Sequence, residues 1–261
     1  MSEKLVLIEK KGRVGIMTVN RPDTMNALNT PMLGALEDAL GTLERDNDVR
    51  VIVITGAGDR AFVAGGDIAD LNSRRGLAHY TEFGEAVQRI FRRFEACDKP
   101  TIAAVNGWAL GGGMELLLAL DIRILSDTVK IGLPEIKLGL FPGAGGSQRL
   151  MRQIPLCRAK EIMFTGDPLT AAEAVSLGVA NRAVPKDKLM DEVMSIAERI
   201  AEKSPLVTRL LKRSMLHGFD MPLPAALSYE QAMISLVLDS DDAHEGCAAF
   251  LEKRRADFAG K

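Results

Sequence analysis

Two glutamates in this chain stand beside glycine runs that could hold a reacting carbonyl. Glu115 follows the run LGGG at 110–113, in what the apolar residues after it predict to be the first turn of a buried helix. Glu135 stands between Pro134 and Ile136, in the segment IGLPEIKLGLFPGAGG at 131–146. A buried carboxylate is costly unless it is paired or neutralised. One such glutamate is more often a helix cap or half of an ion pair, but two beside glycine loops indicate proton transfer.

The glycines suggest where the substrate of such a transfer would bind. The first N–H groups of a helix have no partner within the helix and carry the positive end of its dipole. A thioester carbonyl that becomes an enolate would be stabilised there. A second tight loop, FVAGGDI at 62–68, could supply another N–H, and two such donors form an oxyanion hole. The alternative is that these glycines only permit tight turns.

Other catalytic patterns fit less well. The stretch TGAGDRA at 55–61 matches a dinucleotide-binding pattern loosely, but no apolar-periodic helix follows it. The stretch GAGGSQ at 143–148 fails that pattern at Gln148 and fails the nucleophile-elbow pattern at Arg149. The three histidines lie in polar or helical stretches without nearby acid–base partners, and no metal-binding spacing occurs.

Strands and helices alternate in the part of the chain that carries these residues. Apolar runs predict strands at 4–9, 14–20, 50–55, 100–106 and 122–125. Helices are predicted over 29–46, with Thr30 as N-cap and Pro31 as the first helical residue, and over 77–97. This alternation predicts an α/β core.

The pattern changes after about residue 186, where helical segments follow one another without strands. We therefore expect a catalytic core over 1–194 and a helical module over 195–261. No Gly/Ser linker joins the two, so the module is expected to pack on the core or on a neighbouring subunit.

Composition excludes several classes of protein. The chain has 261 residues, 47% of them apolar, and a net charge of −2, which gives no electrostatic reason to bind nucleic acid or an anionic membrane. No apolar run reaches the roughly 18 residues of a membrane helix. The first 14 residues predict no secretory signal. The three cysteines are far apart and odd in number, which indicates a reducing, cytoplasmic location.

Six stretches, in order along the chain, resemble the signatures of the crotonase superfamily, which contains the enoyl-CoA hydratases and isomerases. They are RPDTMNAL, VIVITGAGDRAFVAGGDI, KPTIAAVNGWALGGGMELLLALDIRI, LPEIKLGLFPGAGGSQRL, TGDPLTAAEAVSLGVANRAVP and HEGCAAFLEKR. The resemblance implies an α/β spiral of repeated ββα units with a C-terminal helical trimerisation region. It also implies homotrimers, often paired as hexamers.

The resemblance further implies roles for individual residues. Ala64 and Gly112 would donate N–H groups to the thioester oxygen, Glu115 would act mainly as the base and Glu135 as the acid. Two acids around one water should titrate as a coupled pair. The implied substrate-binding residues are Asn26, Ala27 and Leu28 near the CoA adenine, and Ala64, Gly65, Gly66, Asp67, Ile68, Gly111, Gly112, Pro134 and Gly143 around the acyl thioester.

Three positions depart from the family pattern. Met114 stands where cysteine is common, and Gly66 stands where alanine is common. Neither change removes an N–H donor. The loop at 21–28 lacks the lysine that many relatives carry before the residue equivalent to Asn26.

The resemblance favours an enoyl-CoA hydratase, which adds water across the 2,3 double bond of a 2-enoyl-CoA. Such an enzyme needs no metal, flavin or nicotinamide. The alternatives are a Δ3-Δ2-enoyl-CoA isomerase or a specialised acyl-CoA dehydratase on the same scaffold, and, less favoured, a non-catalytic or RNA-binding member. Residues 68–83 are expected to shape the acyl pocket.

Overall fold

Two sheets form the centre of the molecule, and the computed structural model describes residues 4–261. In the six-stranded sheet the order is β1 (Val6–Lys11), β2 (Val14–Val19), β3 (Val51–Gly56), β5 (Thr101–Val105), β7 (Ile122–Ser126) and β10 (Arg182–Val184). In the four-stranded sheet it is β4 (Ala61–Val63), β6 (Trp108–Leu110), β8 (Lys130–Gly132) and β9 (Leu169–Thr170). All neighbouring strands are parallel except β1 with β2 and β8 with β9.

The chain steps repeatedly from the large sheet to the small one. β3, β5 and β7 lie in the large sheet, and each is followed by a strand of the small sheet, β4, β6 and β8, and then by a helical segment. Because β4, β6 and β8 are parallel neighbours, their carboxyl ends meet at one edge. The segments that begin at Ala64, at Gly111 and just before Pro134 therefore leave the small sheet side by side, and these segments carry the predicted site.

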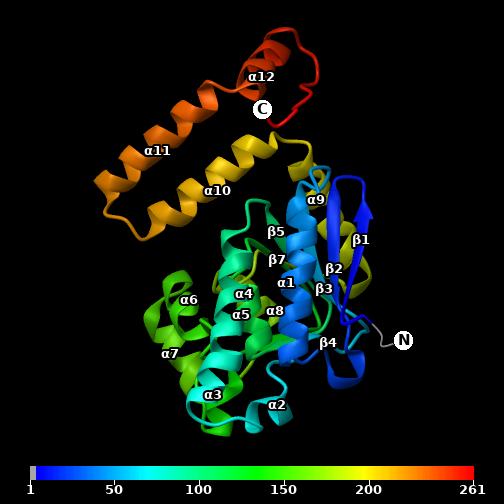
Figure 1. The fold of residues 1–261 in the computed structure, drawn as a ribbon, viewed down its shortest axis with the longest axis vertical. Helices are drawn as coiled ribbons and strands as arrows, with labels where there is room; N and C mark the ends of the chain where they lie inside the picture. Colours follow the sequence, from blue (N-terminus) through cyan, green and yellow to red (C-terminus); the bar gives the residue numbers. More distant parts are fainter. Residues whose placement is uncertain (1–3) are drawn as a thin grey trace.

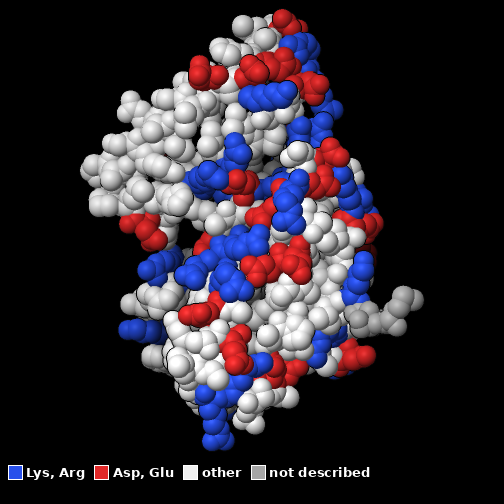
Figure 2. All heavy atoms as spheres, viewed as in Figure 1, with Lys and Arg blue, Asp and Glu red and all other residues white. Residues whose placement is uncertain are grey.

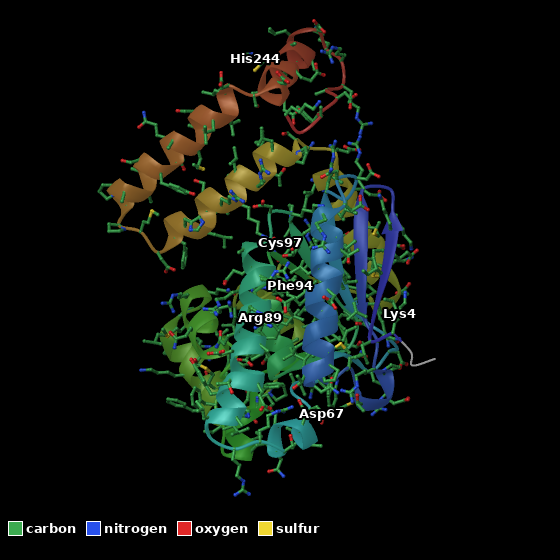
Figure 3. The ribbon with its side chains drawn as sticks, in the orientation of Figure 1. Lys4, Asp67, Arg89, Phe94, Cys97 and His244 are labelled. Carbon is green, nitrogen blue, oxygen red and sulfur yellow. The ribbon has the colours of Figure 1, made fainter. Side chains whose placement is uncertain are left out.

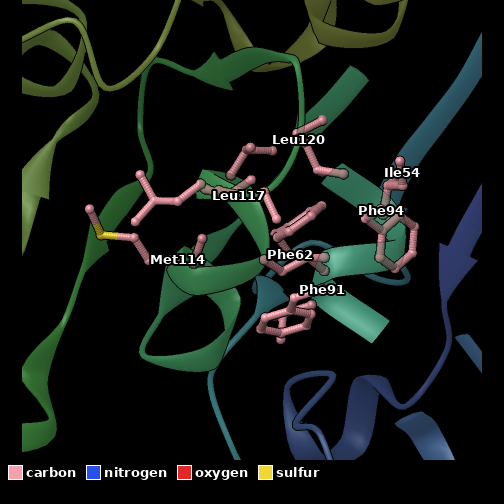
Figure 4. Close-up of a cluster of buried hydrophobic side chains, with 14 of the residues drawn as sticks. Ile54, Phe62, Phe91, Phe94, Met114, Leu117 and Leu120 are labelled. Atoms are coloured by element: carbon pink, nitrogen blue, oxygen red, sulfur yellow. The ribbon is translucent and has the colours of Figure 1, made fainter. Parts of the chain in front are cut away.

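Helices cover both faces of the large sheet (Figure 1). α1 (Thr30–Arg45) and α4 (Glu85–Ala96) lie side by side over one face, and α9 (Leu189–Ala201) packs on the other. The core strands are rich in Val and Ile and are buried on both faces, as parallel strands between helices require. Between the sheets and α4, the buried cluster includes Phe62, Phe91 and Leu117 (Figure 4).

The remaining helices connect these elements or extend from them. They are η1 (Pro22–Thr24), α2 (Ile68–Asn72), α3 (Leu77–His79), η2 (Tyr80–Gly84), α5 (Gly112–Leu118), η3 (Pro134–Leu138), α6 (Gly146–Gln153), α7 (Leu156–Thr165), α8 (Ala171–Ser176), η4 (Lys186–Lys188), α10 (Pro205–Phe219), α11 (Leu223–Leu238) and α12 (Asp241–Leu251). α10 and α11 pair with each other at one end of the molecule, away from the sheets (Figure 1). Among residues 4–261, no helix combines the length and the apolar character needed to cross a membrane.

Some predicted elements differ in detail from the observed ones. The N-cap of α1 is Asn29, whose side chain accepts the N–H of Met32 at 3.0 Å, whereas Thr30 bonds to Asp70 of α2. The helix predicted over 77–97 contains a π-helical turn, η2, between α3 and α4. Residue 195, the expected boundary of the helical module, lies inside α9, and the helices leave the sheet only after α9 ends.

One glycine at the start of α5 has no room for a side chain. A Cβ on Gly113 would lie 1.9 Å from the carbonyl oxygen of Val63 in β4, and backbone cannot move aside cheaply. We expect Gly113→Ala to lower the free energy of unfolding by about 2–3 kcal/mol or more. The control is Gly34→Ala in α1, where a Cβ meets nothing within 4 Å. It should stabilise the protein by about 0.5–1 kcal/mol because alanine favours helix. Urea unfolding measures both, and equal stabilities would contradict the close packing of α5 on β4.

Candidate active site

Three segments meet at the carboxyl edge of the small sheet. The Gly111 N–H donates to the carbonyl of Gly132 at 2.8 Å, which ties the start of α5 to the end of β8. A Cβ on Gly111 would lie 3.3 Å from Oε1 of Glu135, and a Cβ on Gly112 would lie 3.6 Å from the nitrogen of Gly66. The predicted acid Glu135 and the two glycine loops are therefore close neighbours.

Glu115 is buried in the first turn of α5, with 4% of its surface exposed. Its Oε1 accepts two backbone N–H groups, from Ala144 at 2.7 Å and from Gly146 at 2.8 Å. Gly146 has to be glycine, since a Cβ there would lie 2.8 Å from Cγ of Glu115. Burial raises the pKa of Glu115, while the two N–H groups and the charge of Arg149 oppose that rise because they favour the carboxylate.

Glu135 lies in the short helix η3, which Pro134 begins. Both of its carboxyl oxygens are buried, and neither has a hydrogen-bond partner within residues 4–261. Burial, with a further contribution from the negative charge of Glu115, raises the pKa of Glu135 to about 7. The two glutamates thus have different environments: hydrogen bonds from backbone N–H groups support the charged form of Glu115, whereas the carboxyl oxygens of Glu135 receive none within residues 4–261.

The structure corrects one predicted donor of the oxyanion hole. The N–H of Ala64 already donates to the carbonyl of Met25 at 3.1 Å, so it is not available to a substrate. The Gly66 N–H makes no hydrogen bond with any part of the described chain, because the bridge between Leu28 and Gly66 uses the carbonyl of Gly65 and the N–H of Asp67. The N–H of Gly66 is therefore a free donor beside Gly112.

Gly112 meets the requirement for the second donor. It is the first residue of α5, so its N–H has no acceptor within the helix. The preceding Gly111 has φ +51°, a left-handed conformation that favours glycine and turns the chain sharply into the helix. The position of Gly112 thus suits its predicted role as an oxyanion-hole donor, which stays a prediction.

The side chain of Asn26 holds its own loop in place. It is fully buried, with φ +59°, and its side chain accepts the N–H of Arg21 and donates to the carbonyls of Ala57 and Ala61. The side-chain amide is therefore fully engaged within the protein, while the predicted approach of this loop to the CoA adenine stays a prediction. Asn26 fixes the shape of the loop that carries Ala27 and Leu28.

That loop is fastened to the Gly66 loop through Leu28, Asp67 and Arg21. The N–H of Leu28 donates to Gly65, and the N–H of Asp67 donates back to Leu28, both at 2.8 Å. Asp67 also caps α2 and pairs with Arg21 at 3.2 Å, so its carboxylate is engaged within the protein (Figure 3). Arg21 in turn donates to the carbonyl of Ala27. Ile68, which is 54% exposed, remains open to a ligand.

Sequence reasoning missed the residues that hold Glu115. These are Ala144 and Gly146, with Arg149 behind them and Gln88, which donates to the carbonyl of Gly143 at 2.6 Å. The signal was present in GAGGSQR at 143–149, a glycine cluster followed by an arginine, but it fits no familiar nucleotide or nucleophile pattern. Gly143, predicted to bind substrate, has its carbonyl engaged by Gln88.

Comparison with known proteins adds to this geometry. Residues 9–261 match the family described as enoyl-CoA hydratase/isomerase. The chain belongs to the enoyl-CoA hydratase/isomerase family. The crotonyl-CoA hydratase of Syntrophomonas wolfei is 41% identical over 261 residues, and the 2,3-dehydroadipyl-CoA hydratase of Escherichia coli K12 is 36% identical over 261 residues; each alignment covers 100% of both chains.

Solved structures of the family superimpose closely. An enoyl-CoA hydratase from Bacillus anthracis matches with a TM-score of 0.94 and 34% sequence identity, covering 98% of this chain and 100% of the other. This similarity confirms the predicted α/β fold class, and the family match confirms the resemblance to the crotonase superfamily.

The raised pKa of Glu135 has a consequence for stability in this family member. A carboxyl group with pKa about 7 when folded and 4.5 when unfolded loses its proton first in the unfolded chain, so stability falls as pH rises between these values. We expect Glu135→Gln to be more stable than wild type by about 2 kcal/mol at pH 8, and nearly equal at pH 5. Urea unfolding at both pH values checks this. An equal difference at both pH values would mean that Glu135 is not held uncharged.

Proposed function

We propose that this protein is an enoyl-CoA hydratase, which adds water to the 2,3 double bond of a 2-enoyl-CoA to give a 3-hydroxyacyl-CoA. The observation that carries the proposal is that Glu115, which is buried, and Glu135, whose carboxyl oxygens are buried, lie beside the N–H groups of Gly66 and Gly112, which have no acceptor within residues 4–261. The names of the full-length relatives support the same reaction.

In the proposed reaction the thioester oxygen accepts hydrogen bonds from Gly66 and Gly112. Glu115, as carboxylate, takes a proton from a water whose oxygen forms a bond to C3. The electrons of the double bond move to the thioester oxygen, and the two N–H groups stabilise the enolate that results. Glu135, which its pKa of about 7 leaves partly protonated at neutral pH, gives a proton to C2. Transfer of the proton from Glu115 back to Glu135 restores both groups.

The test is the fate of the conjugated thioester. Hydration removes the ultraviolet absorbance of a 2-enoyl-CoA and yields a product heavier by one water. An isomerase would instead form that absorbance from a 3-enoyl-CoA without adding mass. Mass spectrometry of the product with each substrate separates the two reactions, and dehydration of a 3-hydroxyacyl-CoA is the same reaction in reverse. Formation of the 2-enoyl product alone, with no hydration, would overturn the proposal.

The proposed reaction needs no metal, flavin or nicotinamide, because proton transfer and backbone hydrogen bonds supply its chemistry. No role in binding nucleic acid is proposed. A cytoplasmic location is proposed because Cys97, Cys157 and Cys247 are all unpaired thiols. Treatment with a chelator is expected to leave turnover unchanged, and loss of activity on that treatment would contradict the cofactor-free mechanism.

The acyl group is proposed to lie against residues 68–83. This segment begins directly after the Gly66 loop and exposes Ile68, Leu77 and Tyr80, with 54%, 76% and 60% of their surfaces accessible. Kinetics with 2-enoyl-CoA substrates of increasing chain length would define the preferred acyl group. Replacement of Leu77 by a smaller residue should then change that preference more than it changes turnover of the shortest substrate.

A homotrimer or a dimer of trimers is proposed as the assembly. The α10–α11 pair shows mostly uncharged surface (Figure 2), and its exposed apolar residues include Leu211, Met215, Phe219, Leu223, Leu227, Leu236 and Leu238. So large an apolar surface on a helical arm indicates a protein interface. Sedimentation equilibrium should give about three or six times the chain mass of 28.2 kDa. A stable monomer at micromolar concentration would contradict this assembly.

A further inference from the structure

One of the two N–H groups that bind Glu115, that of Ala144, belongs to a peptide unit whose carbonyl is also held by a side chain. In a planar trans peptide the N–H and the preceding C=O point in opposite directions. The N–H of Ala144 donates to Glu115, and the carbonyl of the same peptide, on Gly143, accepts from Nε2 of Gln88 at 2.6 Å. Gln88 therefore controls the orientation of that peptide, and successive hydrogen bonds through one peptide strengthen each other.

Arg149 fastens the next peptide of the same loop. One of its terminal nitrogens donates to the carbonyl of Ala144 at 3.3 Å, while Nε and the other terminal nitrogen donate to the two oxygens of Glu95 at 3.0 and 2.8 Å. A Cβ on Gly145 would lie 2.0 Å from the guanidinium, and Gly145 has φ +107°. The guanidinium thus packs directly against the turn that presents Ala144 and Gly146 to Glu115.

Both supports come from one face of α4. Gln88 and Glu95 are seven residues apart, which is about two helical turns, so they lie on the same side of the helix. On its other side α4 is tied to α1 by ion pairs of Arg89 with Glu37 and of Arg93 with Glu44, and Phe94 fixes it in the core (Figure 3). The loop at 143–146 is therefore anchored to a helix that is itself fixed on the core.

We propose that Arg149, held by Glu95, and Gln88 are positioning residues for Glu115, which fix the loop that orients its carboxylate toward the reacting water. This inference rests on the proposed hydratase function. None of the three residues is assigned contact with the substrate. They act through the backbone of residues 143–146.

The charged groups around Glu115 are Glu135 from η3 and Arg149 from α6, with Glu95 of α4 behind Arg149. The side chain of Arg149 is only 11% exposed, so water screens its charge weakly. The positive charge favours the carboxylate form of Glu115 that a base requires. Loss of that charge should raise the pKa of Glu115 and move the acid limb of the pH profile to higher pH.

The experiment compares Arg149→Met, which removes the charge and the hydrogen bonds, with Arg149→Lys, which keeps the charge but not the planar geometry. For Arg149→Met we expect kcat to fall about tenfold to a hundredfold, since a shift of a catalytic group by about 1 Å has effects of that size. KM should change much less, because no substrate contact is lost. The acid limb of kcat/KM should move to higher pH, and Arg149→Lys should restore its position while recovering kcat only in part.

Gln88→Glu supplies a second test that does not depend on the fold tolerating a change at Arg149. A carboxylate of the same shape cannot donate to the Gly143 carbonyl, so kcat should fall and the acid limb should again move upward. The matched control is Arg89→Met, which removes an exposed ion pair from the other side of the same helix. It should leave both kcat and the pH profile unchanged.

Two results would overturn the inference. One is a folded Arg149→Met variant with wild-type kcat and an unchanged acid limb. If Arg149→Met does not fold, the equivalent result is wild-type kcat in each of the single variants Arg149→Lys and Gln88→Glu, with an unchanged acid limb in Gln88→Glu. The other is an equal effect of Arg89→Met, which would mean that any loosening of α4 slows the reaction. Failure of the proposed function is distinct, because wild-type protein would then not hydrate a 2-enoyl-CoA at all.

Discussion

Replacing Glu115 with glutamine should lower the turnover of 2-enoyl-CoA hydration by about 10²–10⁴-fold, the usual contribution of a general base. Glutamine keeps the size of the side chain, and its carbonyl oxygen can still accept the N–H groups of Ala144 and Gly146. It cannot accept a proton from water. The loss should therefore appear in kcat with little change in KM, and the unfolding midpoint should not fall. Stopped-flow or steady-state absorbance measures the turnover.

Glu135→Gln tests whether the second acid takes part. We expect a loss of about 10²–10⁴-fold here too, because glutamine has no acidic proton to give to C2. Residues that act as one unit are not additive, so the double variant should fall much less than the product of the two losses. Glu161→Gln, which changes an exposed glutamate paired with Arg158, is the control and should be silent. If Glu135→Gln hydrates normally while Glu115→Gln is inactive, a one-acid, isomerase-like mechanism becomes the better description.

The pattern of the sequence was sufficient for the α/β class and for most of the large sheet because these rest on local and periodic signals. It did not predict the short strands β4, β6, β8, β9 and β10, and only the family resemblance implied the ββα units. The buried strands β3, β5 and β7 are short runs of Val, Ile, Ala and Leu between helices, and that alternation has few alternatives. The exact start of α1 was missed since Asn29, Thr30 and Pro31 all favour a helix N-terminus. A tertiary contact decided between them. Thr30 donates hydrogen bonds to Asp70 of α2, and Asn29 is the residue whose side chain caps the helix.

The site residues differ in how far the sequence alone could predict them. Glu115 and Glu135 could be singled out because a carboxylate is costly beside apolar residues, whereas the choice of Gly112 within its glycine run rested on the family resemblance. Ala64 and Gly66 could not be separated, since both are small residues of one loop. The deciding fact is the bond from Ala64 to Met25, which joins segments far apart in sequence. For the same reason the sequence does not reveal the three partners of the Asn26 side chain, Arg21, Ala57 and Ala61.

The hydrogen bonds that hold Glu115 could not be predicted from the sequence, and the reason is again physical. Its hydrogen bonds come from backbone N–H groups at 144 and 146, about 30 residues away, and any residue except proline carries such a group. Of the two donor positions, 144 and 146, only 146 has no room for a side chain. A glycine in the sequence does not show which group lies against it. Gln88 and Arg149 act through carbonyl groups and so leave no pairwise pattern in the sequence.

Proline at position 66 is the sharpest test of the corrected oxyanion hole. Proline removes the N–H of Gly66, while the hydrogen bonds that hold this loop, including those from Leu28 to Gly65 and from Asp67 to Leu28, do not use that N–H. Loss of one oxyanion donor lowers turnover by about 10²–10³-fold, or about 3–4 kcal/mol of transition-state stabilisation. Gly66→Ala keeps the N–H, and its Cβ would approach only the flexible end of Leu71, at 2.9 Å. The alanine variant should therefore lose little.

Gly112→Pro is the companion change at the other donor, with Gly112→Ala as its control. Proline is favoured at the first position of a helix, which Gly112 occupies, so α5 should still form. A Cβ there would lie 3.3 Å from Cδ1 of Leu28, a contact that both variants share and that the alanine control therefore cancels. Each proline variant should be at least about a hundredfold slower than its alanine partner, by steady-state turnover of folded protein. If Gly66→Pro matched Gly66→Ala while Gly112→Pro remained slow, the enolate would be held by α5 alone, and the loop at 64–68 would serve only to shape the site.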